Sequence, residues 1–256
     1  ARQGARMALA ITGAGGLARV LHKEALFFRL WGRLAEVVVT GEALLPGFRK
    51  RLAEQPELME TFHMALNDIA ETAADGVIEA MQPGPASSLL DCGCGAGGYA
   101  GALASRLPEL RIVAVDLPGP AALARAHLDG KGLGKRVEVV PGDFFSGPEA
   151  LSTGTYELVL LSHVLHDYPE DELAEVIRAA AAFLTEGGRL VILDVLADEE
   201  LAHPVEALFG LMMMLENPGG RTHRREILLK AIQQAGLKPV RENKLFFGTL
   251  FSVFRA

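Results

Sequence analysis

The chain has 256 residues, of which 50% are hydrophobic and 22% charged, and its formal net charge is −7. This length allows one large α/β domain with a helical extension, and the acidic balance excludes a surface that is basic overall, so we expect no nucleic-acid partner. The 2 cysteines, Cys92 and Cys94, are too few for a zinc site or a disulfide framework, which predicts no metal and favours a cytoplasmic location. No stretch approaches the ~18 to 20 apolar residues of a membrane span, so we expect no membrane partner.

The first third of the chain has the period of helices. Apolar residues recur every three or four positions over 17–38 and again over 56–81. Between these runs, Gly41, Pro46 and Gly47 interrupt the pattern, and the stretch QPGPASS then marks a boundary near residue 84. We therefore predict a helical segment over 1–84 and a second domain over 85–256.

After residue 84, short apolar runs alternate with segments of helix length. The expected strands are SSLLD, RIVAVD, RVEVVPGD, YELVLLS, RLVILDV, KPVREN and LFFGTLFSVFRA, and the expected helices cover about 97–107, 119–130, 169–184 and 222–235. Apolar strands that alternate with helices indicate a parallel sheet covered on both faces, and the last two strands, with little between them, should pair antiparallel. The predicted fold is α/β: a Rossmann-like, mostly parallel seven-stranded sheet with an antiparallel C-terminal edge strand, preceded by the helical segment.

A glycine-rich loop, DCGCGAGG, follows the first expected strand and fits two cofactor fingerprints. With Gly98 as its last glycine the loop reads G-x-G-x-x-G, which seats a dinucleotide pyrophosphate. Read from Asp91 through Gly93 and Gly95, it is D-x-G-x-G-x-G, which suits an adenosyl ligand without a pyrophosphate. A carboxylate at position 91 sits better beside a cationic methionyl group than beside a pyrophosphate, and Gly98 is then interpreted as a helix-packing residue.

The residues that follow the other strands favour the adenosyl interpretation. Asp116 ends the second strand, where a carboxylate can accept both ribose hydroxyls of an adenosine. Asp143 and Phe144 follow the third strand in GDFF, where they can meet the adenine amino group and ring. The fourth strand is followed by SHVLHDY, which contains His166, and the fifth ends in Asp194.

Together with this loop and these aspartates, the stretches SHVLHDYPEDE and MMMLENPGG give the chain its family likeness. The chain resembles the S-adenosylmethionine-dependent O-methyltransferases of the plant caffeate and animal hydroxyindole type, which have many bacterial members. The resemblance runs from about Leu21 to the C-terminus and implies S-adenosylmethionine as the cofactor and a homodimer in the full-length protein. Similar proteins carry an N-terminal winged-helix-like dimerisation domain, and residues 1–84 are interpreted as a remnant of that region which caps the acceptor pocket.

The resemblance also implies roles for individual residues. It makes His166 the general base, with Asp167 beside it, and Asp194 a carboxylate that helps to orient it; on chemical grounds either aspartate could fix the tautomer of His166. It assigns the cofactor to Asp91, Gly93, Gly95, Asp116, Leu117, Asp143, Phe144 and Ser162, and the acceptor pocket to Phe62, Leu66, Met213 and Asn217. Three positions depart from the family pattern: Ser162 stands where plant-type members usually have a lysine, Asp194 where plant members usually have a glutamate, and Thr222 where the family has a second orienting glutamate.

These residues predict an O-methyltransferase that acts on a hydroxyl of an aromatic or polycyclic small molecule. A histidine is largely neutral at neutral pH, so it can take the proton of a phenol, while the cofactor supplies the reactive methyl group. Because Thr222 departs from the pattern, the same fold and cofactor could instead serve hydroxylation or ring-forming chemistry. A non-catalytic adenosyl-binding protein and a nicotinamide oxidoreductase are further alternatives.

Overall fold

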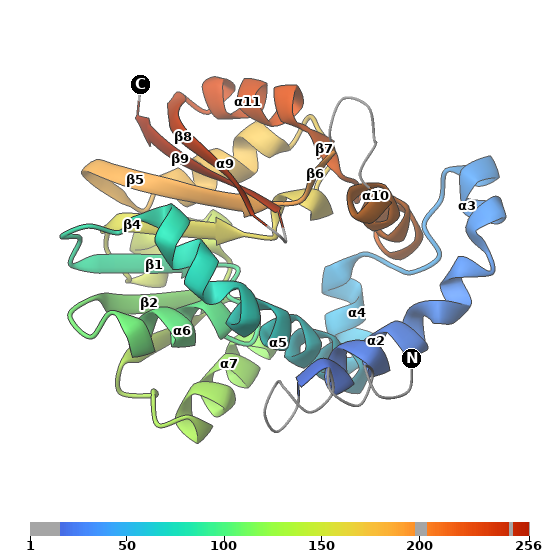
Figure 1. Ribbon diagram of the computed structural model, residues 1–256, viewed down its shortest axis with the longest axis horizontal. Helices are drawn as coiled ribbons and strands as arrows, with labels where there is room; N and C mark the ends of the chain where they lie inside the picture. Colours follow the sequence, from blue (N-terminus) through green and yellow to red (C-terminus); the bar gives the residue numbers. More distant parts are fainter. Residues whose placement is uncertain (1–15, 198–203, 246–247, 256) are drawn as a thin grey trace.

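The computed structural model describes residues 16–197, 204–245 and 248–255. Its centre is a seven-stranded sheet in the order β3-β2-β1-β4-β5-β9-β8 (Figure 1). The strands are β1 (Ser88–Cys92), β2 (Arg111–Asp116), β3 (Val137–Pro141), β4 (Tyr156–Ser162), β5 (Leu184–Asp194), β8 (Leu237–Leu245) and β9 (Gly248–Arg255). β1 to β5 pair in parallel, whereas β9 is antiparallel to both β5 and β8. The predicted mostly parallel sheet with an antiparallel pair at its C-terminal edge is therefore confirmed.

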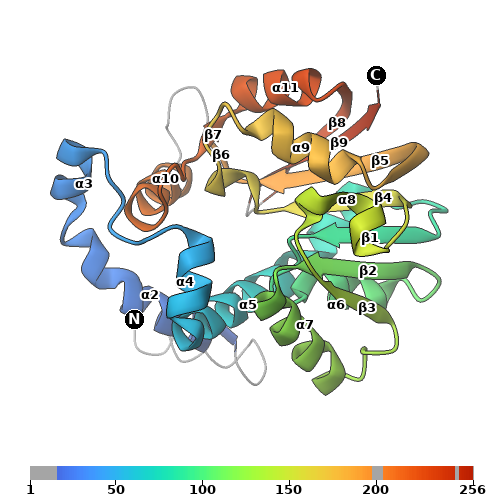
Figure 2. The ribbon, with the colours of Figure 1, turned by 180° about the vertical axis from the view of Figure 1, so that it is seen from behind.

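Both faces of the sheet are apolar because successive side chains of each strand point to opposite sides. Leu90, Cys92, Val113 and Val115 belong to one core, whereas Leu89 and Ile112 belong to the other. The first core is covered by α9 (Leu173–Ala181) and α11 (Arg225–Gln234). The second is covered by α5 (Pro56–Met81), α6 (Gly98–Arg106) and α7 (Pro118–Gly130), as the opposite views in Figures 1 and 2 show.

A set of helices lies beyond the carboxyl ends of the strands (Figures 1 and 2). They are α2 (Gly16–Trp31), α3 (Leu34–Thr40), α4 (Phe48–Glu54) and α10 (Pro204–Glu216). The remaining short elements are η1 (Phe144–Ser146), α8 (Gly147–Leu151), η2 (Leu165–Asp167), and the two-stranded pair β6 (Leu196–Ala197) with β7 (His223–Arg224). The predicted helical segment is confirmed over its described part, and its first 15 residues lie outside the described residues. The seven-residue helix α4 was not predicted.

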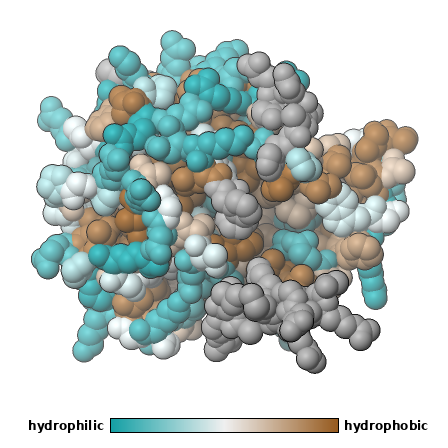
Figure 3. All heavy atoms as spheres, in the orientation of Figure 1, coloured by the Kyte–Doolittle hydropathy of each residue, from teal (hydrophilic) through white to brown (hydrophobic). Residues whose placement is uncertain are grey.

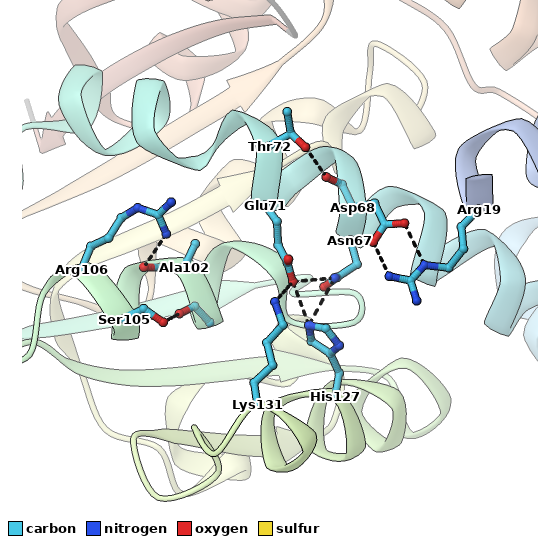
Figure 4. A network of polar contacts seen from close by, with 11 residues as sticks. Arg19, Asn67, Asp68, Glu71, Thr72, Ala102, Ser105, Arg106, His127 and Lys131 are labelled. Atoms are coloured by element: carbon cyan, nitrogen blue, oxygen red, sulfur yellow. Dashed lines mark hydrogen bonds and ion pairs between the residues drawn. The ribbon is translucent and has the colours of Figure 1, made fainter. Parts of the chain in front are cut away.

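The long helix α5 joins the helical segment to the sheet domain through polar contacts (Figure 4). Glu71 of α5 accepts a hydrogen bond from Lys131 at 2.5 Å and lies 2.9 Å from Nε2 of His127 on α7. On the other side, Asp68 accepts from Arg19 of α2 at 2.7 and 2.5 Å. These contacts hold α5 against two neighbouring helices at once.

Gly98 at the start of α6 lets α5 approach closely. A Cβ atom at this position would lie 2.9 Å from the Cβ of Ala70 and 3.0 Å from Oδ1 of Asn67, both on α5. Only a residue without a side chain fits without movement, so the interpretation of Gly98 as a helix-packing residue is confirmed. Among the described residues, no helix has the length and apolar character needed to cross a membrane.

Candidate active site

A cavity of about 1170 Å³ lies where the carboxyl ends of the parallel strands meet the helices beyond them. Residues that follow β1, β2, β3 and β4 line one side, and residues of α2, α4, α5 and α10 line the other. Ligands of open α/β sheets bind outside the carboxyl ends of the strands, so this cavity is the candidate site.

The glycine loop after β1 forms the floor of the cavity with its backbone. Gly93, Gly95 and Gly97 all have positive φ angles, of 73°, 56° and 81°, which residues with a side chain rarely adopt. A Cβ atom on Gly93 would lie 2.8 Å from Cγ2 of Val164, so the loop also needs a glycine there for close packing. This compact loop leads into α6 and brings its own backbone, rather than side chains, to the ligand.

Asp116 at the end of β2 fastens this loop. Its Oδ2 accepts from the amide of Gly95 at 2.8 Å and its Oδ1 accepts from the amide of Leu117 at 2.7 Å. Burial raises the pKa of Asp116 to about 6, although these two amides oppose the rise. Each carboxylate oxygen still has a free lone pair, so the side chain can also accept from a pair of ligand hydroxyls, as predicted for a ribose.

Asp143 and Phe144 follow β3 and line the same cavity. Oδ1 of Asp143 accepts from the amide of Phe145 at 3.2 Å, and its Oδ2 accepts from Nη2 of Arg49 on α4 at 2.6 Å. Phe144 is buried and stacks on Phe145 with ring centroids 4.8 Å apart. An acidic group and an aromatic face are thus present beside Asp116, which fits an adenine base.

Asp91 lies beneath the loop and is absent from the residues that line the cavity. It is fully buried on the face of β1 that carries Leu89, and burial raises its pKa to about 7, with repulsion from Asp116 adding to the rise. The structure therefore brings together the other predicted cofactor residues, including the buried Ser162, but leaves Asp91 one layer below them.

A histidine and an aspartate form a hydrogen-bonded dyad at the ends of β4 and β5. Nδ1 of His166 lies 2.8 Å from Oδ1 of Asp194, and because a carboxylate only accepts, this nitrogen carries the proton. Oδ2 of Asp194 also accepts from the amides of Leu165 and His166, at 2.9 and 3.3 Å. The imidazole packs edge-on against Phe209 and lines the cavity, which leaves Nε2 for a ligand.

The carboxylates around His166 set its protonation. Burial disfavours the imidazolium, but Asp194 and Asp167 outweigh this and raise the pKa of His166 to about 9. Burial also opposes the charge of Asp194, yet His166 holds the pKa of that carboxyl below its usual range. Both shifts favour an imidazolium paired with a carboxylate when no cationic ligand is present.

Asp167 has a different role from Asp194. Its Oδ1 is 4.0 Å from Nε2 of His166, whereas it accepts from Nδ2 of Asn217 at 2.9 Å. Asp194 is therefore the residue that orients the histidine, and Asp167 contributes charge and anchors Asn217 in the cavity wall.

His163 lies beside the dyad in a strained turn after β4. Its φ angle is 54°, which is uncommon for a residue with a side chain, and burial lowers its pKa to about 4. Side-chain atoms of His163, His166 and Asp194 lie within 4.8 Å of one another, but a metal would have to displace the hydrogen bond between His166 and Asp194. We therefore interpret the cluster as a hydrogen-bonded histidine–aspartate dyad with a neutral imidazole beside it.

A family model described as an O-methyltransferase domain matches residues 39–238. The chain belongs to this family. It is 31% identical over 216 residues to the mitomycin biosynthesis 6-O-methyltransferase of Streptomyces lavendulae, a match that covers 82% of this chain and 60% of that protein. It is 32% identical over 212 residues to the aclacinomycin 10-hydroxylase RdmB of Streptomyces purpurascens, covering 80% and 55%.

The chain is also similar to a solved structure of PigF with SAH, with a TM-score of 0.80 and 26% identity. The match covers 92% of this chain and 72% of the PigF chain. The chain thus spans about three fifths of the length of the curated relatives that it matches. The family resemblance that the sequence predicted is confirmed.

The predicted acceptor residues of this O-methyltransferase-family domain lie on, or directly after, the helices that border the cavity. Phe62 and Leu66 of α5, Met213 of α10 and Asn217 all line the cavity. Thr222, at the position of the family's second glutamate, places its hydroxyl 3.5 Å from the backbone oxygen of Glu206. Glu206 lines the cavity and pairs with Lys244 at 3.3 Å, so a carboxylate reaches this wall from α10 instead.

Sequence reasoning missed a set of charged residues in the same wall. Arg49 and Arg51 lie on the unpredicted helix α4, and Lys23 and Glu216 are buried on α2 and at the end of α10. The run of basic residues in FRKRLAE looks like a solvated surface, and only the fold reveals that Arg51 is buried. The signal for this helix in the sequence is Pro46 and Gly47 before it and Pro56 after it, which isolate a short segment.

Proposed function

We propose that this domain is an S-adenosylmethionine-dependent O-methyltransferase that methylates a hydroxyl of an aromatic or polycyclic small molecule, with His166 as the general base. The observation that carries the proposal is the dyad of His166 and Asp194 in the cavity that Asp116 and the glycine loop share. The names of relatives that act on natural products, and a relative solved with SAH, support the same activity and cofactor.

The residues of the cavity fit this cofactor. The backbone of Gly93 and Gly95 would hold the methionyl part, Asp116 and Leu117 the ribose, and Asp143 and Phe144 the adenine. The loop lines the cavity with glycines at 93 and 95, so its backbone is open to a ligand there. When bound, the sulfonium of S-adenosylmethionine supplies an activated methyl group.

The chain itself aligns the acceptor and removes its proton. Asp194 keeps the proton of His166 on Nδ1, so Nε2 of the neutral ring is the atom that accepts a proton from the acceptor hydroxyl. The pKa of His166 is expected to fall when a cation lies in the same cavity, because like charges disfavour the imidazolium. The apolar wall with Phe62, Phe209 and Met213 suits an aromatic ring.

His166→Ala tests the base. We expect the variant to bind S-adenosylhomocysteine as the wild type does in calorimetry, and to lose about 10² to 10⁴ in turnover, the usual contribution of a positioned base. The exposed His22, which does not line the cavity, provides the matched control His22→Ala, and its turnover should be unchanged. Turnover by His166→Ala equal to that of the wild type would remove His166 from the mechanism.

A second candidate is hydroxylation on the same fold and cofactor. It is favoured by the 32% identity to a 10-hydroxylase and by Thr222 in place of a glutamate. Mass analysis of the product separates the two reactions, since methyl transfer adds one methylene unit and hydroxylation adds one oxygen atom.

We also propose that the full-length protein is a cytoplasmic homodimer. The observation that supports a dimer is a set of exposed apolar side chains on α2 and α3, among them Phe28, Val38 and Val39. Figure 3 shows apolar atoms gathered over α3 at the edge of the molecule. Sedimentation of the full-length protein measures its oligomeric state.

A further inference from the structure

Arg51 is an unusual residue of the cavity wall because it is charged and only 2% exposed. It lies on α4, and its guanidinium is 5.7 Å from the ring centroid of Phe48. Arginine is rarely buried to this degree unless a partner of opposite charge is present.

That partner is missing within the described residues. Nε and Nη1 of Arg51 are buried and have no hydrogen-bond partner there, and no carboxylate in this part of the chain forms an ion pair with Arg51 within 4.0 Å. Glu216 and Asp167 act on Arg51 only through space, and burial lowers the pKa of its guanidinium. A buried donor without a partner destabilises the fold, and more so when it is charged.

Arg51 acts on charged groups near His166 and on one residue beside the glycine loop. Its charge acts on Asp167, which follows His166, on Glu216 at the end of α10, and on His63, whose ring lies 3.7 Å from the Cβ position of Gly95. Its neighbour Arg49 binds Asp143 and acts on Asp116, the predicted adenosine residues. The two arginines of α4 thus face different parts of the same cavity.

We propose that Arg51 binds a carboxylate of the acceptor, so that the substrate class is a hydroxylated aromatic carboxylic acid. This inference rests on the proposed function. A carboxylate fits because its two oxygens match the planar fork of a guanidinium, and such charge-assisted pairs are about twice as strong as neutral hydrogen bonds.

The other charged groups around Arg51 are compatible with an anionic ligand. Lys23, 3% exposed, also lines the cavity, lies 5.6 Å from the ring centroid of Phe62 and pairs with Glu24 at 2.8 Å, so its charge is already partly balanced. Glu216 opposes an anion only when it is ionised, and burial raises its pKa to about 7, although Lys23 and Arg51 lower it. Its buried Oε1 has no hydrogen-bond partner among the described residues, so the neutral acid can donate to a ligand oxygen.

Binding to the protein saturated with S-adenosylhomocysteine tests the assignment without turnover. The probes are 3-hydroxy-1-naphthoate and 2-naphthol, which differ by the carboxylate. We expect Arg51→Met to weaken the binding of 3-hydroxy-1-naphthoate by about 10- to 150-fold, which corresponds to the loss of one charge-assisted hydrogen bond. The binding of 2-naphthol should be unchanged. The control Lys230→Met removes an exposed charge from α11, away from the cavity, and should bind both probes as the wild type does.

A carboxylate is also present in the cofactor, so a second pair of probes separates the two sources. S-adenosylhomocysteine has an amino-acid carboxylate and 5′-methylthioadenosine has none. We expect Arg51→Met to bind both as the wild type does. If the loss falls on S-adenosylhomocysteine while 3-hydroxy-1-naphthoate is unaffected, the acceptor assignment is overturned, and equal binding of all four probes by both proteins overturns it as well.

Thermal unfolding without ligands distinguishes a ligand-binding role from a structural one. Arg51→Met removes a buried unpaired charge and keeps an apolar side chain of similar length, so its melting temperature should rise. A lower melting temperature would show that Arg51 stabilises the empty fold and would contradict the proposal. Naphthoate binding that depends on Arg51, together with no methylation of any acceptor, would reject the proposed function and would leave only a carboxylate-binding site at Arg51.

Discussion

Replacing Asp194 with asparagine removes the charge that defines the dyad while keeping the size of the side chain. Asp194 accepts from Nδ1 of His166 at 2.8 Å and from the backbone amides of Leu165 and Val195 at 2.9 and 2.8 Å. Asparagine has only one accepting oxygen, so its amide group would face at least one of these donors. The imidazole then loses both its counter-charge and its fixed tautomer.

The size of the effect follows from the geometry. Two unit charges 2.8 Å apart interact by about 6 kcal/mol at an effective dielectric constant of about 20. The net rise of the pKa of His166 from 6.5 to about 9 corresponds to about 3 kcal/mol, because burial cancels part of the attraction. Without the carboxylate of Asp194, burial acts with little opposition, and the pKa of His166 should fall to about 6.5 or below.

The assay is the pH dependence of kcat/KM for the acceptor at saturating S-adenosylmethionine. For the wild type, the rate rises with pH as His166 loses its proton, with an inflection above 6.5. In Asp194→Asn the inflection should move down by about 2 pH units, and kcat should fall by about 10² to 10⁴, as in other histidine–aspartate pairs. An inflection that stays in place would refute the conclusion that Asp194 sets the protonation of His166.

Two further predictions concern the packing of α6 and the hold on the cofactor. Gly98→Ala should lower the free energy of unfolding by about 1 to 3 kcal/mol, because its Cβ would overlap Ala70. The control Gly76→Ala, which has open space around it on α5, should not lower it. Thermal unfolding of both variants checks this, and equal melting temperatures would contradict the close contact at Gly98. Asp116→Asn should weaken the binding of S-adenosylhomocysteine by about 10- to 150-fold in calorimetry. The reason is that one of the two carboxylate oxygens, which accept from backbone amides and would accept from the ribose, becomes an amide group. An unchanged dissociation constant would place the ribose elsewhere.

The parts of the site that local sequence determines were predictable. A strand, a turn of glycines and a helix follow one another without a gap, so the loop around Gly93 could be placed from spacing alone. The same holds for Asp116 and Asp143, because parallel strands bring their carboxyl ends to one edge of the sheet.

The partner of His166 needed the three-dimensional register. The residue types alone left both Asp167 and Asp194 open, and only the family resemblance favoured Asp194, although Asp167 is the neighbour in the chain. In the sheet, Ser162 of β4 pairs with Leu193 of β5, which brings Asp194 next to the turn after β4. Adjacent strands, rather than adjacent residues, therefore form the dyad.

The cofactor and acceptor sides of the cavity differ in how they are built. The cofactor side depends on backbone conformation and on Asp116, which the sequence pattern reveals, whereas the acceptor side depends on side chains from four helices. In an apolar wall, one methylene group changes the preference between two ligands by only about 1 to 3 kcal/mol. A buried polar group that a ligand leaves unpaired lowers the preference for that ligand by a factor of about 10⁴ to 10⁵. Arg51 and Glu216 are such groups in this wall, so acceptor choice should follow the charge pattern of the ligand more closely than its size.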